Sequence, residues 1–445
     1  MSRGFESHTL RFRLDRGAAP PERTPVSESR APRRRSTVAR HGELSSPSVW
    51  SQIVRFVAVA VAVVLVAGVG VVAFQAYSAV TSFTSAAVEL EGQAAVPPDI
   101  GEIEGGVNLF LAGTDACEPE YAELFGDRCT GADAGGELND VNMLVHISDE
   151  PRRVTVVSFP RDLMIPIPEC TDPETGRTSS AMSKQPLNAT FSYGGLACAV
   201  KTVSELSGQE IPFAASVTWG GVIEITNAIG GVEVCIANGI KDYHTGIDWP
   251  EGNRNLQGLE ALQFLRTRHG VGNGGDLGRI SNQQQYMSRL ARKLISNETL
   301  SNPATLYSLA TTALNNITAS QTLTNPLTMV QIALAVKDVP FEEIVFVSYP
   351  VVDDPFDTNR VVPNYAAANE LWAALEANKP IQLSGEASQG DGVIVETPAP
   401  ADPSTDPTEQ ASPAPSEEPG EAVATLPPSI AGQTAAMETC SNGNA

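Results

Sequence analysis

Two aspartates occupy positions from which carboxylates can bind a cation. Asp115 directly follows an apolar run at 106–112, and Asp140 directly precedes another at 141–147. Carboxylates at the ends of adjacent strands converge, and oxygen ligands without Cys or His suit Mg²⁺, with Mn²⁺ as a second choice. The alternative interpretation is that Asp115 caps a turn and Asp140 begins a strand, as aspartate often does.

Arginines gather in two further clusters, although the chain carries 52 acids against 29 bases and a net charge of −23. Arg161 follows a predicted strand in the run Pro-Arg-Asp, while Arg266, Arg268 and Arg279 lie close together in a later segment. Grouped guanidiniums repel one another unless an anion joins them, which favours a di- or polyphosphate ligand. Two alternatives stay open: a surface ion pair for Arg161, and a solvated helix end for the later arginines.

Several other classes of chemistry lack their usual motifs. The sequence contains no Gly-x-Ser-x-Gly elbow, no Walker loop and no His-Glu-x-x-His. The glycine cluster at 270–275 precedes a predicted helix without following a strand, so it is not a dinucleotide-binding turn. The acidic net charge argues against nucleic acid as a partner, because phosphate neutralisation along a duplex needs a basic face.

The elements that must position these residues lie in one predicted globular domain, residues 104–384. The apolar run at 106–112 predicts a strand, and the runs at 141–147 and 153–159 predict a hairpin. Helical spacing follows, with strand-like runs at 231–236 and 343–347 among the helices. The predicted helices span 198–207, 219–229, 256–266, 278–296, 303–315 and 326–336. This alternation predicts an α/β fold with a central mixed sheet flanked by helices.

A membrane span is predicted before this domain, over residues 56–77. The nineteen residues 56–74 carry neither a charge nor a hydrogen-bonding side chain, long enough to cross the roughly 30 Å hydrocarbon layer as a helix. A signal peptide is less consistent, because its apolar core is shorter and begins near the terminus. Five arginines between residues 33 and 55 precede the span and no base follows until Arg128, which predicts a single-pass protein of the cell membrane with a cytoplasmic N-terminus and an extracellular C-terminal domain.

The remaining segments have the composition of unstructured chain. Residues 1–55 are basic and rich in Pro and Ser, residues 78–103 are predicted to form an extracellular stalk, and residues 385–445 are acidic and rich in Pro. Because such segments cannot bury enough apolar surface to offset the entropy of ordering, both termini are predicted to be disordered.

Six cysteines suit an extracellular domain. No Cys-x-x-Cys spacing or nearby His suggests zinc, so disulfides are favoured. Cys117 and Cys129 bracket a short acidic loop that they could close. Cys170, Cys198 and Cys235 offer one further pair that the sequence does not choose.

The order of these motifs resembles the LytR-CpsA-Psr family of bacterial envelope proteins over about residues 106–350. The resemblance begins with Gly113-Thr114-Asp115, Asn139-Asp140-Val141 and Phe159-Pro160-Arg161-Asp162. It continues with Leu187-Asn188-Ala189-Thr190, Tyr193-Gly194-Gly195, Ile229-Gly230-Gly231-Val232, Arg266-Thr267-Arg268-His269 and Asp276-Leu277-Gly278-Arg279-Ile280 with the glutamines at 283–285.

The resemblance implies transfer of a glycopolymer from a polyprenyl-pyrophosphate carrier to a peptidoglycan hydroxyl. Asp115 and Asp140 would hold Mg²⁺ against the pyrophosphate, and Arg161, Arg266 and Arg268 would bind its oxygens. The residues that support these groups from behind would be Asp162, Asp276, Arg279 and Gln283. Asp162 is the candidate for accepting the proton of the attacking hydroxyl.

The chain departs from the family pattern at two phosphate-facing charges. Leu138 stands where many members carry Arg, and Pro186 where many carry Lys; Asn282 also replaces an Arg. Arg128 and Lys184 are candidate substitutes. Two alternative functions therefore stay open, a lipid pyrophosphate hydrolase and a non-catalytic module that binds or regulates the wall.

Overall fold

The computed structural model describes residues 48–59, 87–91, 106–131, 136–173, 175–295, 303–396 and 422–445. The predicted basic segment lies almost wholly outside these ranges. Of the predicted membrane span only residues 56–59 are described, as the end of a helix over 49–59; the rest lies outside. Among the described helices, none has the length and apolar character needed to cross a bilayer.

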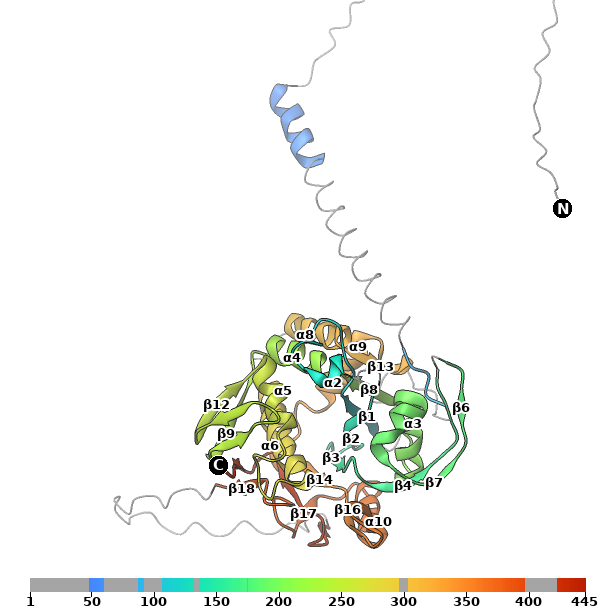
Figure 1. Ribbon diagram of the computed structural model, residues 1–445. Helices are drawn as coiled ribbons and strands as arrows, with labels where there is room; N and C mark the ends of the chain where they lie inside the picture. Colours follow the sequence, from blue (N-terminus) through green and yellow to red (C-terminus); the bar gives the residue numbers. More distant parts are fainter. Residues whose placement is uncertain are drawn as a thin grey trace, which may run out of the picture. The chain divides into compact units, whose positions relative to one another are not determined.

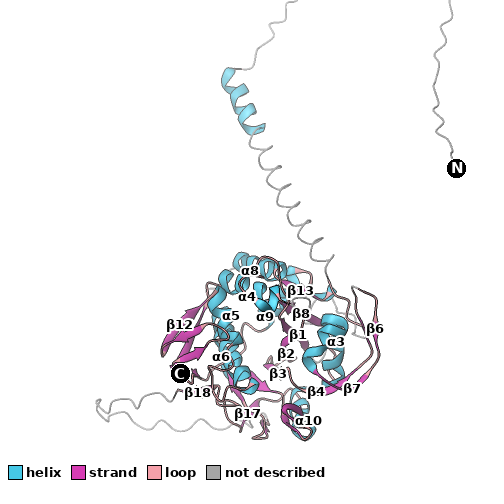
Figure 2. Cartoon of the chain, in the orientation of Figure 1, coloured by secondary structure: helices cyan, strands magenta, loops and turns pink. Residues whose placement is uncertain are grey.

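A seven-stranded mixed sheet forms the centre of the domain (Figures 1 and 2). The strands lie in the order β13-β8-β1-β2-β3-β14-β20. β1 (Val107–Thr114), β2 (Asn139–Ile147) and β3 (Val154–Phe159) are antiparallel neighbours, while β8 (Phe213–Val217) and β14 (Ile344–Ser348) run parallel to β1 and β3. The edges are β13 (Ile317–Ala319) and β20 (Gly432–Thr434). The predicted central mixed sheet is confirmed.

Helices cover both faces of this sheet, so its central strands are apolar on both sides. On one face, Phe110 and Leu144 pack against α3 (Thr190–Ser207) and α10 (Tyr365–Glu376). On the other, Met143 and Val156 pack against α6 (Asp276–Ile295), α8 (Pro303–Asn315) and α9 (Pro326–Ala335). Figure 1 shows α3 and α6 on opposite sides of β1–β3.

A second sheet of four strands, in the order β12-β9-β21-β18, lies beside α5 and α6. Its strands are β12 (Gly252–Leu256), β9 (Val232–Asn238), β21 (Thr439–Asn442) and β18 (Val393–Val395). Together with α4 (Trp219–Ala228) and α5 (Gly258–Arg266), these elements carry the segment that contains the arginine cluster.

Short elements complete the described fold, as two-stranded pairs, single turns and one short helix. They are α2 (Asp127–Thr130), β4 (Met164–Ile167), β5 (Cys170–Thr171), β6 (Thr178–Ser179), β7 (Met182–Pro186), η2 (Leu187–Ala189), β10 (Ile240–Asp242), β11 (Ile247–Trp249), η3 (Gln321–Leu323), η4 (Phe341–Glu343), β15 (Val351–Asp354), β16 (Asp357–Pro363), β17 (Ile381–Leu383) and β19 (Ala424–Leu426).

The prediction of a disordered tail over 385–445 is wrong for residues 385–396, which contain β18, and for residues 422–445. β20 extends the central sheet along β14, and β21 inserts between β9 and β18. Cys440 is fully buried and forms a disulfide with Cys235. The Pro-rich composition belongs mainly to residues 397–421, which lie outside the described residues, and it masked the short strands that follow.

The other two disulfides join Cys117 to Cys129 and Cys170 to Cys198. The first pair is the predicted one, and the second settles the choice that the sequence left open. Within the predicted stalk, residues 87–91 are described and lie on the domain, where Val88 bridges to Ser320 beside β13.

Candidate active site

Asp115 and Asp140 meet at one end of the β1–β2 pair. A register shift at Gly113 and Thr114 brings Thr114 opposite Asn139. The backbone N–H of Leu138 donates to Asp115 Oδ1 at 2.7 Å, and the N–H of Asp115 donates to the Leu138 carbonyl at 3.2 Å. β1 and β2 are antiparallel neighbours, so β1 ends where β2 begins. Asp115 at the end of β1 and Asp140 at the start of β2 therefore lie at the same edge of the sheet.

Arg128 reaches Asp115 from the loop that the Cys117–Cys129 disulfide closes. Its guanidinium lies 2.8 Å from Asp115 Oδ2 and donates to the Gly136 carbonyl at 2.6 Å. Arg128 therefore lies beside Asp115, and its role as a substitute for the missing phosphate-facing charge stays a prediction. Lys184, the other candidate substitute, is instead 2.6 Å from Asp354, whose carboxylate is buried on the β15–β16 hairpin.

Arg161 connects three acidic groups at the same end of the sheet. Its Nη1 lies 3.0 Å from Asp140 Oδ1, and its Nε lies 3.5 Å from both Asp162 Oδ2 and Asp276 Oδ1. Burial acts to lower the pKa of Arg161, but Asp140 and Asp276 outweigh it and raise that pKa above its ordinary value. Arg279 also joins this network, 2.6 Å from Asp276 and donating to the Asp140 carbonyl at 3.0 Å.

Several buried polar atoms of this network find no hydrogen-bond partner within the described part of the chain. Arg279 leaves its Nε and Thr114 its hydroxyl without a hydrogen bond, and Arg161 Nε makes no hydrogen bond, although the carboxylates of Asp162 and Asp276 lie 3.5 Å away. Since unused buried donors are costly, they favour a ligand or water between the two guanidiniums. Donors that point into a site suit an anion.

Arg266 lies over an aromatic platform at the end of α5. Its guanidinium carbon is 3.8 Å from the ring centre of Trp219 and 6.0 Å from that of Phe125. Burial lowers the pKa of Arg266 below its ordinary value, and the guanidiniums of Arg279 and Arg128 act in the same direction. Asp140 and Asp115 both act on this guanidinium, so the two aspartates and Arg266 share one neighbourhood.

Arg268 follows in a segment that one buried carboxylate organises. Asp242 accepts hydrogen bonds from the Thr267 hydroxyl and from the backbone N–H groups of Arg268 and His269. Burial acts to raise the pKa of Asp242, but these hydrogen bonds outweigh it and lower that pKa. The carboxylate therefore stays charged and fixes the backbone beside His244, whose N–H also bonds to it.

The two remaining predicted site residues, Gln283 and Asp162, differ in their surroundings. Gln283 lines the cavity described below while its amide donates to the Leu265 carbonyl at 2.8 Å. Asp162 lies beside Arg161 and forms a second ion pair with Arg360, so both of its oxygens already face guanidiniums. The role of Asp162 in accepting a proton stays a prediction.

A cavity of about 650 Å³ extends from this charged cluster into the apolar space between the sheet and its helices. Its polar end includes Asp140, Arg161, Arg266, Arg268, Arg279 and Gln283. The rest is lined by apolar side chains of the sheet and of α4, α6, α8 and α9, including Leu111, Met143, Ile225, Met287, Leu290, Leu309, Ala313, Met329 and Val330. The cavity is therefore charged at one end and apolar along its length, so it matches an amphiphilic ligand.

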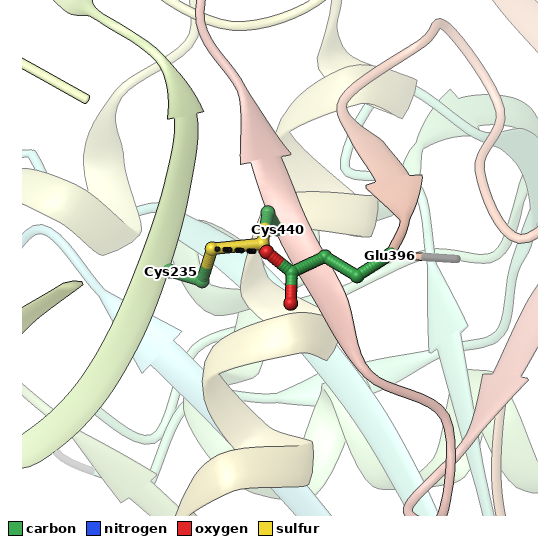
Figure 3. Close-up of side chains that lie close together, drawn as sticks. All are labelled: Cys235, Glu396 and Cys440. Carbon is green, nitrogen blue, oxygen red and sulfur yellow. Dashed lines mark hydrogen bonds between the residues drawn. A yellow bond between two sulfur atoms is a disulfide. The ribbon is translucent and has the colours of Figure 1, made fainter. Parts of the chain in front are cut away.

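Among the described residues, only Cys235, Glu396 and Cys440 bring three side chains of metal-binding type within reach of one ion (Figure 3). Their two sulfurs are joined in a disulfide and are not thiolate ligands. Asp115 and Asp140 offer only carboxylate oxygens, as Mg²⁺ prefers, and Mg²⁺ often takes one or two carboxylates together with phosphate oxygens of a substrate. This donor set fits the predicted ion.

The chain belongs to the LytR_cpsA_psr family, whose family model matches residues 72–377. One relative is the cell wall biosynthesis protein LcpA of Corynebacterium glutamicum, 27% identical over 321 residues, which cover 68% of this chain and 60% of LcpA. Another is the polyisoprenyl-teichoic acid–peptidoglycan teichoic acid transferase TagU of Enterococcus faecalis, 28% identical over 37% of this chain and 50% of TagU. The chain thus spans less than two thirds of the length of these relatives.

Solved structures of other proteins are also similar to this chain. B. subtilis TagV is 22% identical, with a TM-score of 0.47 over 62% of this chain and 97% of TagV. A LytR-Csp2A-Psr enzyme from Actinomyces oris is 20% identical, with a TM-score of 0.45 over 65% of this chain and 95% of that one.

Proposed function

We propose that this chain transfers a glycopolymer from a polyprenyl-pyrophosphate carrier onto peptidoglycan. The observation that carries the proposal is the cavity, which has a cluster of guanidiniums at one end of an otherwise apolar chamber. A lipid pyrophosphate has the same polarity, with a doubly charged head and a hydrocarbon chain. Relatives described as teichoic acid transferases to peptidoglycan support the choice of acceptor.

The charged end can stabilise the departing phosphate. The acceptor hydroxyl attacks the phosphorus next to the sugar, so the P–O–P bond of the pyrophosphate breaks, the polymer moves with that phosphate, and polyprenyl phosphate leaves. Negative charge grows on the departing phosphate oxygen, and guanidiniums already in position bind that charge more strongly than the ground state. Arg279 has an unused Nε donor for this purpose. Arg266 stacks on Trp219, and no carboxylate of the described residues forms an ion pair with it, so its N–H groups are available to phosphate oxygens.

Mg²⁺ would be held by Asp115 and Asp140, and it would neutralise part of the pyrophosphate charge when bound. Arg128 and Arg161, which contact these carboxylates, keep them oriented in its absence. We further propose that Asp162 accepts the proton of the attacking hydroxyl and that residues 56–77 anchor the protein in the cell membrane, with the domain outside.

The test uses the full chain in vesicles with a polyprenyl-pyrophosphate-linked glycopolymer, isolated peptidoglycan and Mg²⁺. We expect polymer to become covalently attached to peptidoglycan as polyprenyl phosphate is released. Arg266→Ala should lower kcat/KM by about a hundredfold or more, the usual effect of losing one charge-stabilising donor. Arg254→Ala is the matched control, because Arg254 also stacks on a tryptophan, Trp249 at 4.6 Å, but does not line the cavity.

The products separate the alternative functions. Release of polyprenyl phosphate at the same rate without peptidoglycan would identify a hydrolase. Absence of turnover, with binding of the lipid donor retained, would identify a non-catalytic module. Equal losses in Arg266→Ala and Arg254→Ala would contradict the role assigned to the charged cluster.

A further inference from the structure

Two surface helices of this domain lack the charges that surface helices normally carry. Residues 303–336, which contain α8 and α9, include no Asp, Glu, Lys or Arg, and the next ionisable side chain is Lys337. Charged residues make up 18% of the whole chain, so a stretch of this length would ordinarily hold several. A soluble surface helix pairs its apolar stripe with a charged face.

The outer side of this helix pair is uncharged and carries exposed apolar side chains. Leu327 is 59% exposed, Leu334 40% and Tyr307 44%. In α9 eight of the ten residues are apolar, yet Pro326 is the only one that is buried. A helix of this apolar character is normally buried in a protein core or in lipid, and the described part of this domain covers α9 only in part, leaving Leu327 and Leu334 exposed.

The inner side of the same pair forms a wall of the apolar cavity. Leu309 and Ala313 of α8 and Met329 and Ala333 of α9 line it. Figure 1 shows the two helices side by side. The pair therefore separates the cavity from the surroundings with apolar side chains on both sides.

The chain that follows the predicted membrane span is attached at the base of this pair. The N–H of Val88 donates to the Ala319 carbonyl, and the N–H of Gln321 donates to the Val88 carbonyl, both at 2.9 Å. Ala319 and Gln321 lie in the connection between α8 and α9. The ten residues 78–87 separate this anchor from the predicted span, and they reach at most about 36 Å.

We propose that the outer face of α8 and α9, marked by Tyr307, Leu327 and Leu334, docks on the lipid bilayer. This proposal rests on the proposed function, because docking brings the wall of the cavity to the membrane that holds the lipid donor. The apolar chain of the donor then enters between the helices without crossing water, a passage that would otherwise cost its hydrophobic transfer free energy. Since the pair carries no charge, docking should depend neither on anionic lipid nor on salt.

The direct test places one spin label at a time on the full chain in phosphatidylcholine vesicles. All six cysteines are in disulfides, so introduced cysteines at 327, 334 and 356 are the reactive ones. Phe356 is the control position, because it is 90% exposed but lies beside Asp354 and Asp357 on the β15–β16 hairpin. We expect labels at 327 and 334 to be accessible to oxygen and shielded from a water-soluble nickel chelate, and the label at 356 to show the opposite. Equal nickel accessibility at all three positions would overturn the proposal.

A functional test uses two donors that differ only in the length of the lipid. Leu327→Asp with Leu334→Asp should raise the apparent KM for a full-length donor in vesicles by about tenfold or more, because charges on this face oppose contact with the bilayer. The KM for a water-soluble donor of two isoprene units should not change. Val352→Asp with Phe356→Asp is the control and should alter neither value. Equal effects of both double variants, or an equal effect on both donors, would contradict docking. If the wild-type chain transfers neither donor, the proposed function fails, and the labels still decide whether the surface meets lipid.

Discussion

The disulfide between Cys235 and Cys440 should contribute more to stability than either of the other two. It closes a loop of 205 residues, against 28 for Cys170–Cys198 and 12 for Cys117–Cys129. The loss of chain entropy on cross-linking corresponds to about 5 kcal/mol for the long loop, about 3.5 for the middle one and about 3 for the short one. Whole domains are stable by only about 5–15 kcal/mol, so removal of the first should be severe.

The measurement is urea denaturation of the full chain in detergent micelles, followed by tryptophan fluorescence. We expect Cys235→Ala with Cys440→Ala to lose more free energy of unfolding than Cys170→Ala with Cys198→Ala. Alanine is chosen because Cys440 and Cys170 are buried and a serine hydroxyl would lack a partner. A loss no greater than that of the control pair would refute the reasoning from loop length.

The same variant should also lose activity under conditions where the domain remains folded. Residues after Cys440 hold the segment that follows Arg268: the N–H of Gly272 donates to the Asn442 carbonyl at 2.8 Å, and the Asn444 amide donates to the His269 carbonyl at 2.6 Å. Without the disulfide this strand can open locally and release the segment. The expected result is a fall in kcat for the Cys235 and Cys440 variant, and unchanged kcat for the Cys170 and Cys198 control.

Three further predictions concern single residues. Trp219→Leu should lower kcat/KM for transfer by about tenfold, because a buried cation–π contact is worth up to about 2 kcal/mol, and steady-state kinetics measure it. Burial lowers the pKa of His146 to about 4, so between about pH 4 and 6.5 the unfolded chain binds more protons than the folded one. The free energy of unfolding should therefore fall by about 3 kcal/mol as the pH drops through that window. His146→Phe should remove this pH dependence, which urea titrations at pH 7 and 4 will measure. Lys184→Met should leave transfer within twofold of wild type, whereas Arg128→Gln should lower it at least about tenfold, which kinetics of the two variants side by side will check.

Much of the fold was predictable because its elements carry strong local patterns. The hairpin at β2 and β3 and the helices α4, α5 and α6 lie within two residues of the predicted ranges. Two elements that the sequence analysis missed lack such a pattern. β8 (Phe213–Val217) is a run of five residues with two alanines and a serine, and it becomes a central strand only because β1 and β13 pair with it. α10 follows an acidic hairpin, and its alanine-rich repeat was not distinguished from coil.

Lys184 and Arg128 show why sequence distance is a poor guide to the position of a charge. Lys184 is only two residues from Pro186 on β7, yet its ammonium lies 2.6 Å from Asp354 on the β15–β16 hairpin. Arg128 lies ten residues before Leu138, but the Cys117–Cys129 disulfide and the Gly136 carbonyl return it to Asp115. The predicted Cys117–Cys129 crosslink therefore decides where this guanidinium lies, and distance along the chain from Leu138 does not.

The C-terminal strand extends the same argument from one residue to a whole segment. The average composition of residues 385–445 predicts disorder. That prediction applies to a segment folding in isolation, because such a segment buries too little apolar surface by itself. β21 does not fold alone: its backbone bonds are completed by β9 and β18, and its Ser441 hydroxyl bonds to Gln285 of α6 at 2.9 Å. The second and third glutamines of the family motif thus face the buried scaffold, and only Gln283 lines the cavity. The run 283–285 therefore joins the charged site to the strand that supports it, so a substitution at Gln285 should act through the position of that strand rather than through contact with substrate.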